Sequence, residues 1–341
     1  MLRTLAATTA LLVTIPVAAQ ARTTIVYDGH STARQLATDS GSRYCTADVL
    51  RVNREERSAD RQTCSRFVPR VNAYQLLARD AAGMAALLKS AIDRRPAGGG
   101  RPVHAVAVDE IGNEFRDPRP RVRLKTVRIG GRSFRIAAQH RVQRLPKGGW
   151  KIVRRPAPAG ARPGPAHPGS RLARAMKILA DTPAPWGGSY ASRVHFFAAP
   201  AFTTAIAAGN GPHFTLNKSG TRHVRAGWRG VMPALARAGG VWLAMYHGDG
   251  APLNARTWRL GPSRVADYLR RSGGDAGRLH FVIGGLASAP AGSVGCSTAM
   301  ACHWALARER QNAAILANGV GAWRLGSRTG EFAREHAATF G

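Results

Sequence analysis

Val103-His-Ala-Val-Ala-Val-Asp-Glu110 is the first of five short apolar runs that divide the chain from about residue 100 onward. The other four span residues 194–199, 241–247, 279–283 and 320–325, and polar or Gly-rich breaks and amphipathic stretches separate them. Near-continuous apolar strands that alternate with helices indicate a parallel sheet buried on both faces. In barrels built this way, chemistry takes place where the strands end. We therefore expect a functional site directly after these runs.

The rest of the chain supplies further strands and the helices between them. Residues 23–27 form a sixth strand, and residues 49–52 and 67–71 add up to two more. Amphipathic stretches predict helices over 72–95, 170–180, 222–238, 263–271, 297–318 and 329–340. Six to eight strand–helix units predict an α/β fold. We expect a (β/α)8 barrel, regular or with irregular units, rather than an open doubly wound sheet. No Gly-x-Gly-x-x-Gly follows the first strand, as a dinucleotide-binding fold would require.

An insertion over residues 116–168 interrupts this rhythm. Apolar and basic residues alternate between 121 and 154, and Gly130-Gly131 and Lys147-Gly-Gly149 are typical of hairpin turns. Residues 155–169 are rich in Pro, Gly and Ala, which indicates a flexible return segment. We expect antiparallel β-hairpins inserted in the loop after the 103–108 strand, beside the mouth of the barrel.

The net charge of +31 is concentrated in this part of the chain. Residues 118–180 contain 17 Lys or Arg and no Asp or Glu. A tract of this kind binds polyanions non-specifically, and a solvated basic insertion without a binding role is the alternative. The expected partners are polysaccharide or another anionic cell-surface polymer, with peripheral contact to an anionic membrane. We expect no specific nucleic-acid partner, and the sequence predicts no oligomeric state.

The N-terminus has the features of a secretory signal peptide. Met1-Leu-Arg3 precedes an apolar stretch over residues 5–19, and Ala19-Gln-Ala21 is a typical cleavage site. Residues 1–21 are thus predicted to be removed after Ala21, which leaves a single exported domain over 22–341. An even number of cysteines in an exported protein predicts two disulfides, Cys45–Cys64 and Cys296–Cys302. Cys-x5-Cys-His303 lacks the usual ligand spacing of a zinc site, so we expect no metal and no cofactor.

The first candidate site is Val108-Asp109-Glu110-Ile-Gly-Asn-Glu114. Alternation places Asp109 on the face of Ala105 and Ala107, and Glu110 on the opposite face. The small residues suggest a tight barrel interior, which directs Asp109 inward, while Glu110 begins the loop over the mouth. Crowded carboxylates repel one another, so one holds its proton and the site gains both a general acid and an ionised partner. The alternative is a strand-end acid that caps a helix or pairs with an arginine.

The second candidate site is Met245-Tyr246-His247-Gly-Asp249-Gly250, at the end of another strand. Its hydrogen-bonding groups suit a sugar, and Asp249 is expected to face Asp109 and Glu110 across the mouth. Two carboxylates on either side of a glycosidic bond are what its hydrolysis requires. A Gly-flanked turn is the alternative. The predicted substrate-binding set also contains Trp186 and Trp258, which are expected in loops where Trp stacks on sugars, together with Glu114 and Arg324.

Residues 100–341 resemble secreted (β/α)8 proteins of the glycoside-hydrolase type. The resemblance rests on the regular alternation of strands and helices, on Asp109-Glu110 and on Tyr246-His247-x-Asp249. The chain lacks the Asp-x-x-Asp-x-Asp-x-Glu run of the chitinase type. The resemblance implies an exported enzyme that hydrolyses extracellular or cell-wall polysaccharide. Glu110 is then the general acid/base, Asp249 or Asp109 is the partner carboxylate, and Tyr246 and His247 orient the substrate. The alternative is a non-catalytic secreted protein that binds wall polymers or other polyanions through residues 118–180.

Overall fold

A computed structural model of the chain describes its regular elements and most of the connections in the second half. The described residues are 24–27, 49–53, 66–77, 79–94, 103, 105–112, 124–137, 140–146, 148–154, 168–209, 214–216, 223–225, 228, 230–246, 253–284, 289–290, 292–323 and 325–340. The predicted signal peptide lies outside these residues. Among the helices that the structure describes, none is long and apolar enough to cross a membrane.

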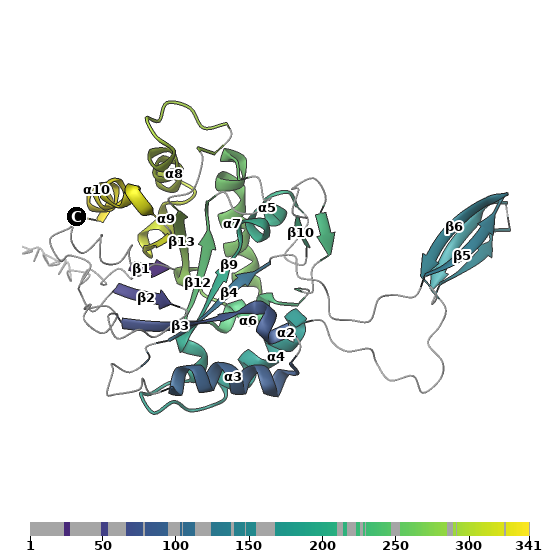
Figure 1. Ribbon diagram of the computed structural model, residues 1–341, viewed down its shortest axis with the longest axis horizontal. Coiled ribbons are helices and arrows are strands. Elements are labelled where there is room, and N and C mark those ends of the chain that lie inside the picture. The colour runs from purple at the N-terminus through teal and green to yellow at the C-terminus, as the bar shows by residue number, and fades with distance from the viewer. Residues whose placement is uncertain are drawn as a thin grey trace, which may run out of the picture.

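Eight parallel strands form a closed barrel at the centre of the molecule (Figure 1). In hydrogen-bonded order they are β1 (Thr24–Tyr27), β14 (Val320–Trp323), β13 (Leu279–Gly284), β12 (Gly240–Ala244), β9 (Val194–Ala198), β4 (Val106–Ile111), β3 (Arg66–Asn72) and β2 (Val49–Asn53). The pairing of β1 with β2 closes the ring. Because every pair is parallel, all carboxyl ends of the strands lie at one end of the barrel.

Helices follow most of the later strands and lie outside the ring in Figure 1. They are α2 (Ala73–Leu77), α3 (Ala81–Asp93), α4 (Pro168–Ala180), α5 (Pro200–Ala207), α6 (Met232–Arg237), α7 (Ala255–Arg271), α8 (Ala299–Arg308), α9 (Ala313–Ala317) and α10 (Thr329–Phe340), with short 3-10 turns η3 (Tyr190–Arg193), η4 (Ala276–Arg278) and η5 (Gly326–Arg328). The predicted α/β class is therefore confirmed. The segments that follow β1 and β2 lie outside the described residues, so the helices of a complete (β/α)8 barrel at those places stay a prediction.

The two faces of the strands bury different side chains. The outward faces join the helices in one large core, in which Val71, Val108, Phe196 and Phe281 are buried. The inward faces form a second cluster that fills the barrel, and its members are Val68, Ala105, Ala107, Phe197, Trp242, Ala244, Tyr246 and Val282, with Trp323 packed against them. Burial on both faces explains why these strands are apolar runs without alternation in the sequence.

Several predicted helices differ from those observed. The helix predicted over 72–95 is two helices, because Asp80 accepts a hydrogen bond from the Gly83 amide and starts α3 as its N-cap. The helix predicted over 297–318 is also divided, into α8 and α9. The helix predicted over 222–238 is only α6, and β11 (His223–Arg225) pairs with β10 (Phe214–Leu216) before it. Apolar spacing extends across such breaks, so it overestimates the length of these helices. The helix predicted over 263–271 is instead longer than expected, because α7 already begins at Ala255.

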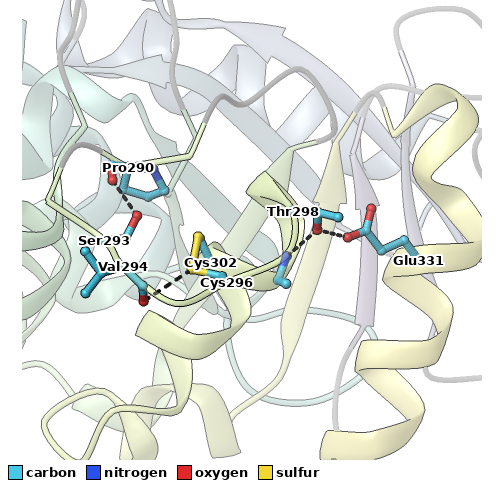
Figure 2. The surroundings of a disulfide bond; sticks show 8 residues. Pro290, Ser293, Val294, Cys296, Thr298, Cys302 and Glu331 are labelled. Atoms are coloured by element: carbon cyan, nitrogen blue, oxygen red, sulfur yellow. Dashed lines mark hydrogen bonds between the residues drawn. A yellow bond between two sulfur atoms is a disulfide. The ribbon is translucent and has the colours of Figure 1, made fainter.

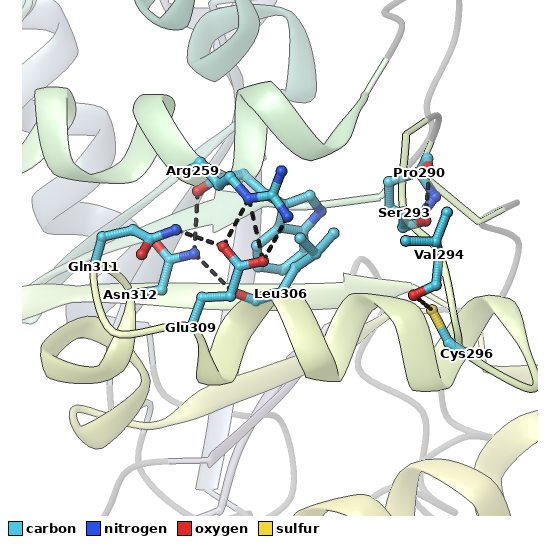
Figure 3. Close-up of polar contacts among 10 residues, drawn as sticks. Arg259, Pro290, Ser293, Val294, Cys296, Leu306, Glu309, Gln311 and Asn312 are labelled. Carbon is cyan, nitrogen blue, oxygen red and sulfur yellow. Dashed lines mark hydrogen bonds and ion pairs between the residues drawn. The ribbon is translucent and has the colours of Figure 1, made fainter.

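One polar cluster fixes the helix layer beside β13 (Figure 3). Arg259 of α7 binds Glu309 with both ends of its guanidinium, at 2.9 Å for Nε–Oε2 and 2.8 Å for Nη2–Oε1. This hydrogen bond lowers the pKa of the Glu309 carboxyl. Asn312 is completely buried and donates to the carbonyls of Trp258 and Leu306. These hydrogen bonds therefore hold the chain between α8 and α9 against α7.

The insertion consists of two antiparallel hairpins. β5 (Leu124–Ile129) pairs with β6 (Arg132–Ala137), and β7 (His140–Arg144) pairs with β8 (Trp150–Arg154). Gly130 and Gly131 both have positive φ, 55° and 80°, as the two-residue turn between β5 and β6 requires. Figure 1 draws β5 and β6 outside the barrel. The insertion leaves the barrel at the carboxyl end of β4 and returns to it at α4.

Two histidines and a tryptophan fill the amino end of the barrel. Trp242 Nε1 donates to His195 Nδ1 at 3.1 Å, and the Trp242 ring stacks on His280 with the centroids 4.1 Å apart. A Cβ on Gly240 would lie 2.4 Å from His195 Nδ1, so only glycine leaves room for this hydrogen bond. Burial lowers the pKa of His280 to about 4. His280 is therefore neutral in the folded protein at neutral pH.

The neutral state of His280 predicts a loss of stability in mild acid. The pKa of His280 is about 4 in the folded protein and 6.5 for a histidine in water, as in the unfolded chain. Between these two pH values the unfolded chain therefore binds a proton that the folded chain does not. The free energy of unfolding is expected to fall by about 3 kcal/mol between pH 6.5 and pH 4 and to be insensitive to this group above pH 6.5. Urea unfolding of His280→Phe, which keeps a ring against Trp242, should lack this part of the pH dependence. Parallel pH profiles of the two proteins would contradict the assignment.

Candidate active site at the carboxyl end of the barrel

Asp109 lies at the carboxyl end of β4 and is buried, with 7% of its surface exposed. It is two residues beyond Ala107 on the inward face, as predicted from alternation. On the neighbouring strand β3, Asn72 is its partner in register and Arg70 is the partner of Ala107. Arg70 Nη1 lies 3.2 Å from Asp109 Oδ2, and each side chain is 9% exposed. The carboxyl end of the barrel thus contains a buried ion pair.

This ion pair places a positive charge beside the Asp109 carboxyl group. An opposite charge at hydrogen-bonding distance favours the ionised form of a carboxyl group. Beside the pair, Asn72 is also buried, and its side-chain oxygen has no hydrogen-bond partner among the residues that the structure describes. Its backbone amide donates to Gln75 Oε1 at 2.9 Å, which fixes the turn after β3. The strand ends therefore contain a carboxylate paired with a guanidinium, and one polar oxygen.

A β-bulge follows Asp109. Val108 pairs with Phe196 and Ile111 pairs with Ala198, so Asp109 and Glu110 together lie opposite the single residue Phe197. Both Val108 and Ile111 are buried in the outer core. Strict alternation, which placed Glu110 on the outward face, is therefore interrupted between residues 108 and 111. Bulges are common at barrel rims and beside active sites, where they change the direction of a side chain. The Glu110 side chain itself is outside the part that the structure describes.

The chain turns away from the barrel directly after this bulge. The Ala199 amide donates to the Ile111 carbonyl at 2.8 Å, which holds the end of β4 against β9. Gly112 has φ of +88°, and a Cβ there would lie 2.4 Å from Cβ of Phe202 in α5. Only glycine fits both conditions. The sequence Asp109-Glu110-Ile111-Gly112 thus ends a strand at a fixed place and starts the insertion.

Two stacked aromatic rings lie across the barrel from the ion pair. Tyr246 follows β12 and Trp323 ends β14, and their centroids are 4.2 Å apart with the planes 12° from parallel. Gly284, at the end of the intervening strand β13, leaves room for them, because a Cβ there would lie 2.9 Å from atoms of both rings. Tyr246 is buried, whereas Trp323 is partly exposed. The strand ends thus combine a carboxylate on one side with an aromatic wall on the other.

A disulfide fixes the loop between β13 and α8 (Figure 2). Cys296 and Cys302 are bonded, which confirms this predicted pair. Thr298 caps α8 by accepting from the Ala301 amide at 3.1 Å, and its hydroxyl also hydrogen-bonds to Glu331 of α10. Val294 is 91% exposed in the same loop. Because the loop starts at the carboxyl end of β13, the disulfide constrains one side of the barrel mouth.

The structure places the predicted aromatic residues elsewhere. Trp258 was predicted in a loop, and this prediction is wrong. It lies inside α7, where it is completely buried against Phe281 and His303. Trp186 does lie in a loop, but this loop joins α4 to the amino end of β9, at the opposite end of the barrel from Asp109. Arg193 also covers the Trp186 ring at 3.5 Å. Neither tryptophan is brought together with Tyr246.

The remaining predicted residues lie outside the described part of the chain. These are Cys45, Cys64, Glu114, His247, Asp249 and Arg324. Their roles and the Cys45–Cys64 disulfide stay predictions. Among the residues that the structure does describe, no group of three or more His, Cys, Asp or Glu is placed to hold a metal ion.

Sequence reasoning missed Arg70, Asn72 and Trp323. The first two share the inward face of β3 with Val68, so polar residues take over an apolar face towards the strand end. The sequence Val68-Pro-Arg70-Val-Asn72 contains this pattern, but it predicts residues 67–71 only as one of up to two additional strands. A tryptophan in a predicted strand does not by itself indicate a site, because buried tryptophans are common in helix–sheet cores. The position of Trp323 as the last residue of β14 is visible only in the structure, because the predicted strand extends to residue 325.

Comparisons with known proteins add no relative. No protein-family model, curated protein or solved structure matches the chain. The functional argument therefore rests on the residues at the strand ends.

Proposed function

We propose that the protein is a (β/α)8-barrel glycoside hydrolase that acts on extracellular or cell-wall polysaccharide as an exported protein. The observation that carries this proposal is the buried Arg70–Asp109 pair at the carboxyl end of β3 and β4. In barrels of this kind the active site lies at that end. The aromatic wall of Tyr246 and Trp323 on the other side supports a sugar as the ligand.

The ion pair assigns different roles to the two acids of the bulge. Asp109 is held ionised by Arg70, so it is unsuited to donate a proton and suited to stabilise the positive charge of an oxocarbenium-like transition state. Glu110, the next residue in the bulge, takes the role of general acid and protonates the leaving oxygen. Asp249 keeps its proposed place as the partner carboxylate from the loop after β12. Tyr246 and Trp323 orient the sugar ring between these groups.

Trp323 gives a test of the sugar-binding wall. Trp323→Ala removes the partly exposed ring, and we expect kcat/KM for polysaccharide hydrolysis to fall about tenfold, mostly through KM, because a stacking contact is lost. Trp186→Ala is the matched control, since Trp186 is also partly exposed but lies at the amino end of the barrel. Equal kinetics of the two variants would place the sugar elsewhere.

The activity itself is tested with a panel of purified polysaccharides. The full exported chain is incubated with peptidoglycan, chitin, β-glucans and acidic polysaccharides, and new reducing ends are measured. The proposal predicts release from at least one polymer, and loss of that release in Glu110→Gln. It is abandoned if the folded wild-type protein cleaves none of them.

A further inference from the structure

The turn of the β7–β8 hairpin exposes two large apolar side chains. Leu145 directly precedes the turn and is 41% exposed, and Trp150 directly follows it and is 51% exposed. The turn is well formed: the Leu145 amide donates to the Gly149 carbonyl at 3.0 Å, and the Gly148 amide donates to the Leu145 carbonyl at 3.1 Å. Gly148 and Gly149 both have positive φ, as this turn needs. The two side chains are thus held on either side of one hairpin tip.

This exposure is concentrated on the insertion. Among the described residues, the exposed large hydrophobic side chains are Phe134, Leu145, Trp150, Ile178 and Val294. Three of these belong to the two hairpins, with Phe134 on β6. An apolar side chain gains free energy when it leaves water. The exposed Leu145 and Trp150 at one hairpin tip therefore indicate a surface that another phase or partner covers.

The charges around the tip all have one sign. Arg144 pairs with Trp150 across the hairpin, with its guanidinium 5.8 Å from the ring centroid. Arg141 and Lys151 are exposed on the same hairpin. No Asp or Glu occurs between residues 118 and 180, so this part of the chain provides no acid to neutralise them. The tip is therefore complementary to a negatively charged surface.

We propose that the β7–β8 tip is a membrane-docking element that binds the surface of an anionic lipid bilayer. Leu145 and Trp150 enter the boundary between headgroups and acyl chains, and Arg144 and Lys151 lie at the lipid phosphates. Trp is favoured at this depth because its ring is apolar and its N–H is polar. An acidic polysaccharide explains the cations and Trp150, but its hydroxyl-rich chain does not cover Leu145. The aliphatic residue beside the tryptophan thus favours lipid.

The insertion joins the barrel at the bulge, so docking has a consequence for the proposed active site. The hairpins leave from the carboxyl end of β4, where Asp109 lies. A hairpin bound to a bilayer would tether the barrel to the membrane through the chain that follows β4. Lipid binding does not depend on hydrolysis, however, and it can be tested by itself.

The test is co-sedimentation of the full exported chain with lipid vesicles. We expect binding to vesicles of phosphatidylcholine and phosphatidylglycerol at about 7:3, and much weaker binding to phosphatidylcholine alone. Leu145→Ser/Trp150→Ser should weaken binding to the anionic vesicles about tenfold or more, because both side chains lose their apolar environment. Ile178→Ser is the matched control, since Ile178 is 43% exposed on α4, outside the hairpins. It should bind as the wild type does.

A second double variant separates the contribution of charge from that of apolar contact. Arg144→Gln/Lys151→Gln should lower binding at low salt but matter less at about 0.5 M salt, where exposed charges are screened. A tip variant that binds anionic vesicles as tightly as the wild type would overturn the proposal. Binding of the wild type to polygalacturonate but not to the vesicles would also overturn it and would assign the surface to acidic polysaccharide.

Discussion

Asp109→Asn is expected to lower the free energy of unfolding by about 3–5 kcal/mol, because it leaves the Arg70 guanidinium charged and buried. The two side chains are each only 9% exposed, so water is a poor substitute for the lost carboxylate. Urea unfolding monitored by circular dichroism measures the change. Among the substitutions considered, this one has the largest expected effect on stability.

A double variant tests whether the pair itself is the cause. In Arg70→Met/Asp109→Leu both charges are replaced by apolar side chains of similar size, and we expect stability close to that of the wild type. As a control, Lys177→Met/Asp181→Leu removes an exposed ion pair at the end of α4, which should contribute less than about 1 kcal/mol. If Asp109→Asn is as stable as the wild type, the Asp109 carboxylate does not stabilise the Arg70 guanidinium through a buried ion pair.

Glu110→Gln is expected to have the second large effect, on catalysis rather than stability. Loss of a general acid lowers the rate of bond cleavage by about 10²–10⁴-fold. The amide has nearly the shape of the acid but cannot protonate the leaving oxygen. The reducing-end assay on the polysaccharide that the wild type cleaves measures the loss, mainly in kcat.

The control for Glu110→Gln is another acid at the carboxyl end of the barrel without a proposed role. Glu331 of α10 hydrogen-bonds to Thr298 beside the disulfide loop, so Glu331→Gln changes charge at the same end of the barrel. It should retain most of the wild-type rate. Wild-type turnover of Glu110→Gln would instead remove Glu110 from the mechanism and leave Asp249 as the remaining candidate acid.

The architecture was largely predictable because burial on both faces of a strand leaves a strong signal. The runs that contain Phe196, Leu243 and Phe281 were recognised as buried parallel strands, and all three lie in the outer core. Weak strands were harder: Val49–Asn53 and Arg66–Asn72 are polar in part, and only ring closure shows that they complete the barrel. Helix lengths were overestimated where a cap such as Asp80 interrupts an apolar pattern.

The candidate site was predictable only in part, because it depends on contacts between strands. Alternation from Ala105 and Ala107 predicts Asp109 on the inward face, and Asp109 pairs there with Arg70, which shares its face of β3 with Val68. It did not reveal Arg70, whose proximity to Asp109 follows from the register of β3 on β4. It also did not reveal the bulge, since an extra residue in one strand is defined only against its partner β9.

The most direct test of the proposed active site is the rate of polysaccharide hydrolysis by Arg70→Met/Asp109→Leu. This variant removes the carboxylate without leaving a buried unpaired charge, so stability and catalysis are separated. We predict a protein that unfolds at nearly the wild-type urea concentration and releases reducing ends at least about 10²-fold more slowly. A variant that is equally stable and hydrolyses at the wild-type rate would show that the Arg70–Asp109 pair is structural and that the strand ends of β3 and β4 are not the active site.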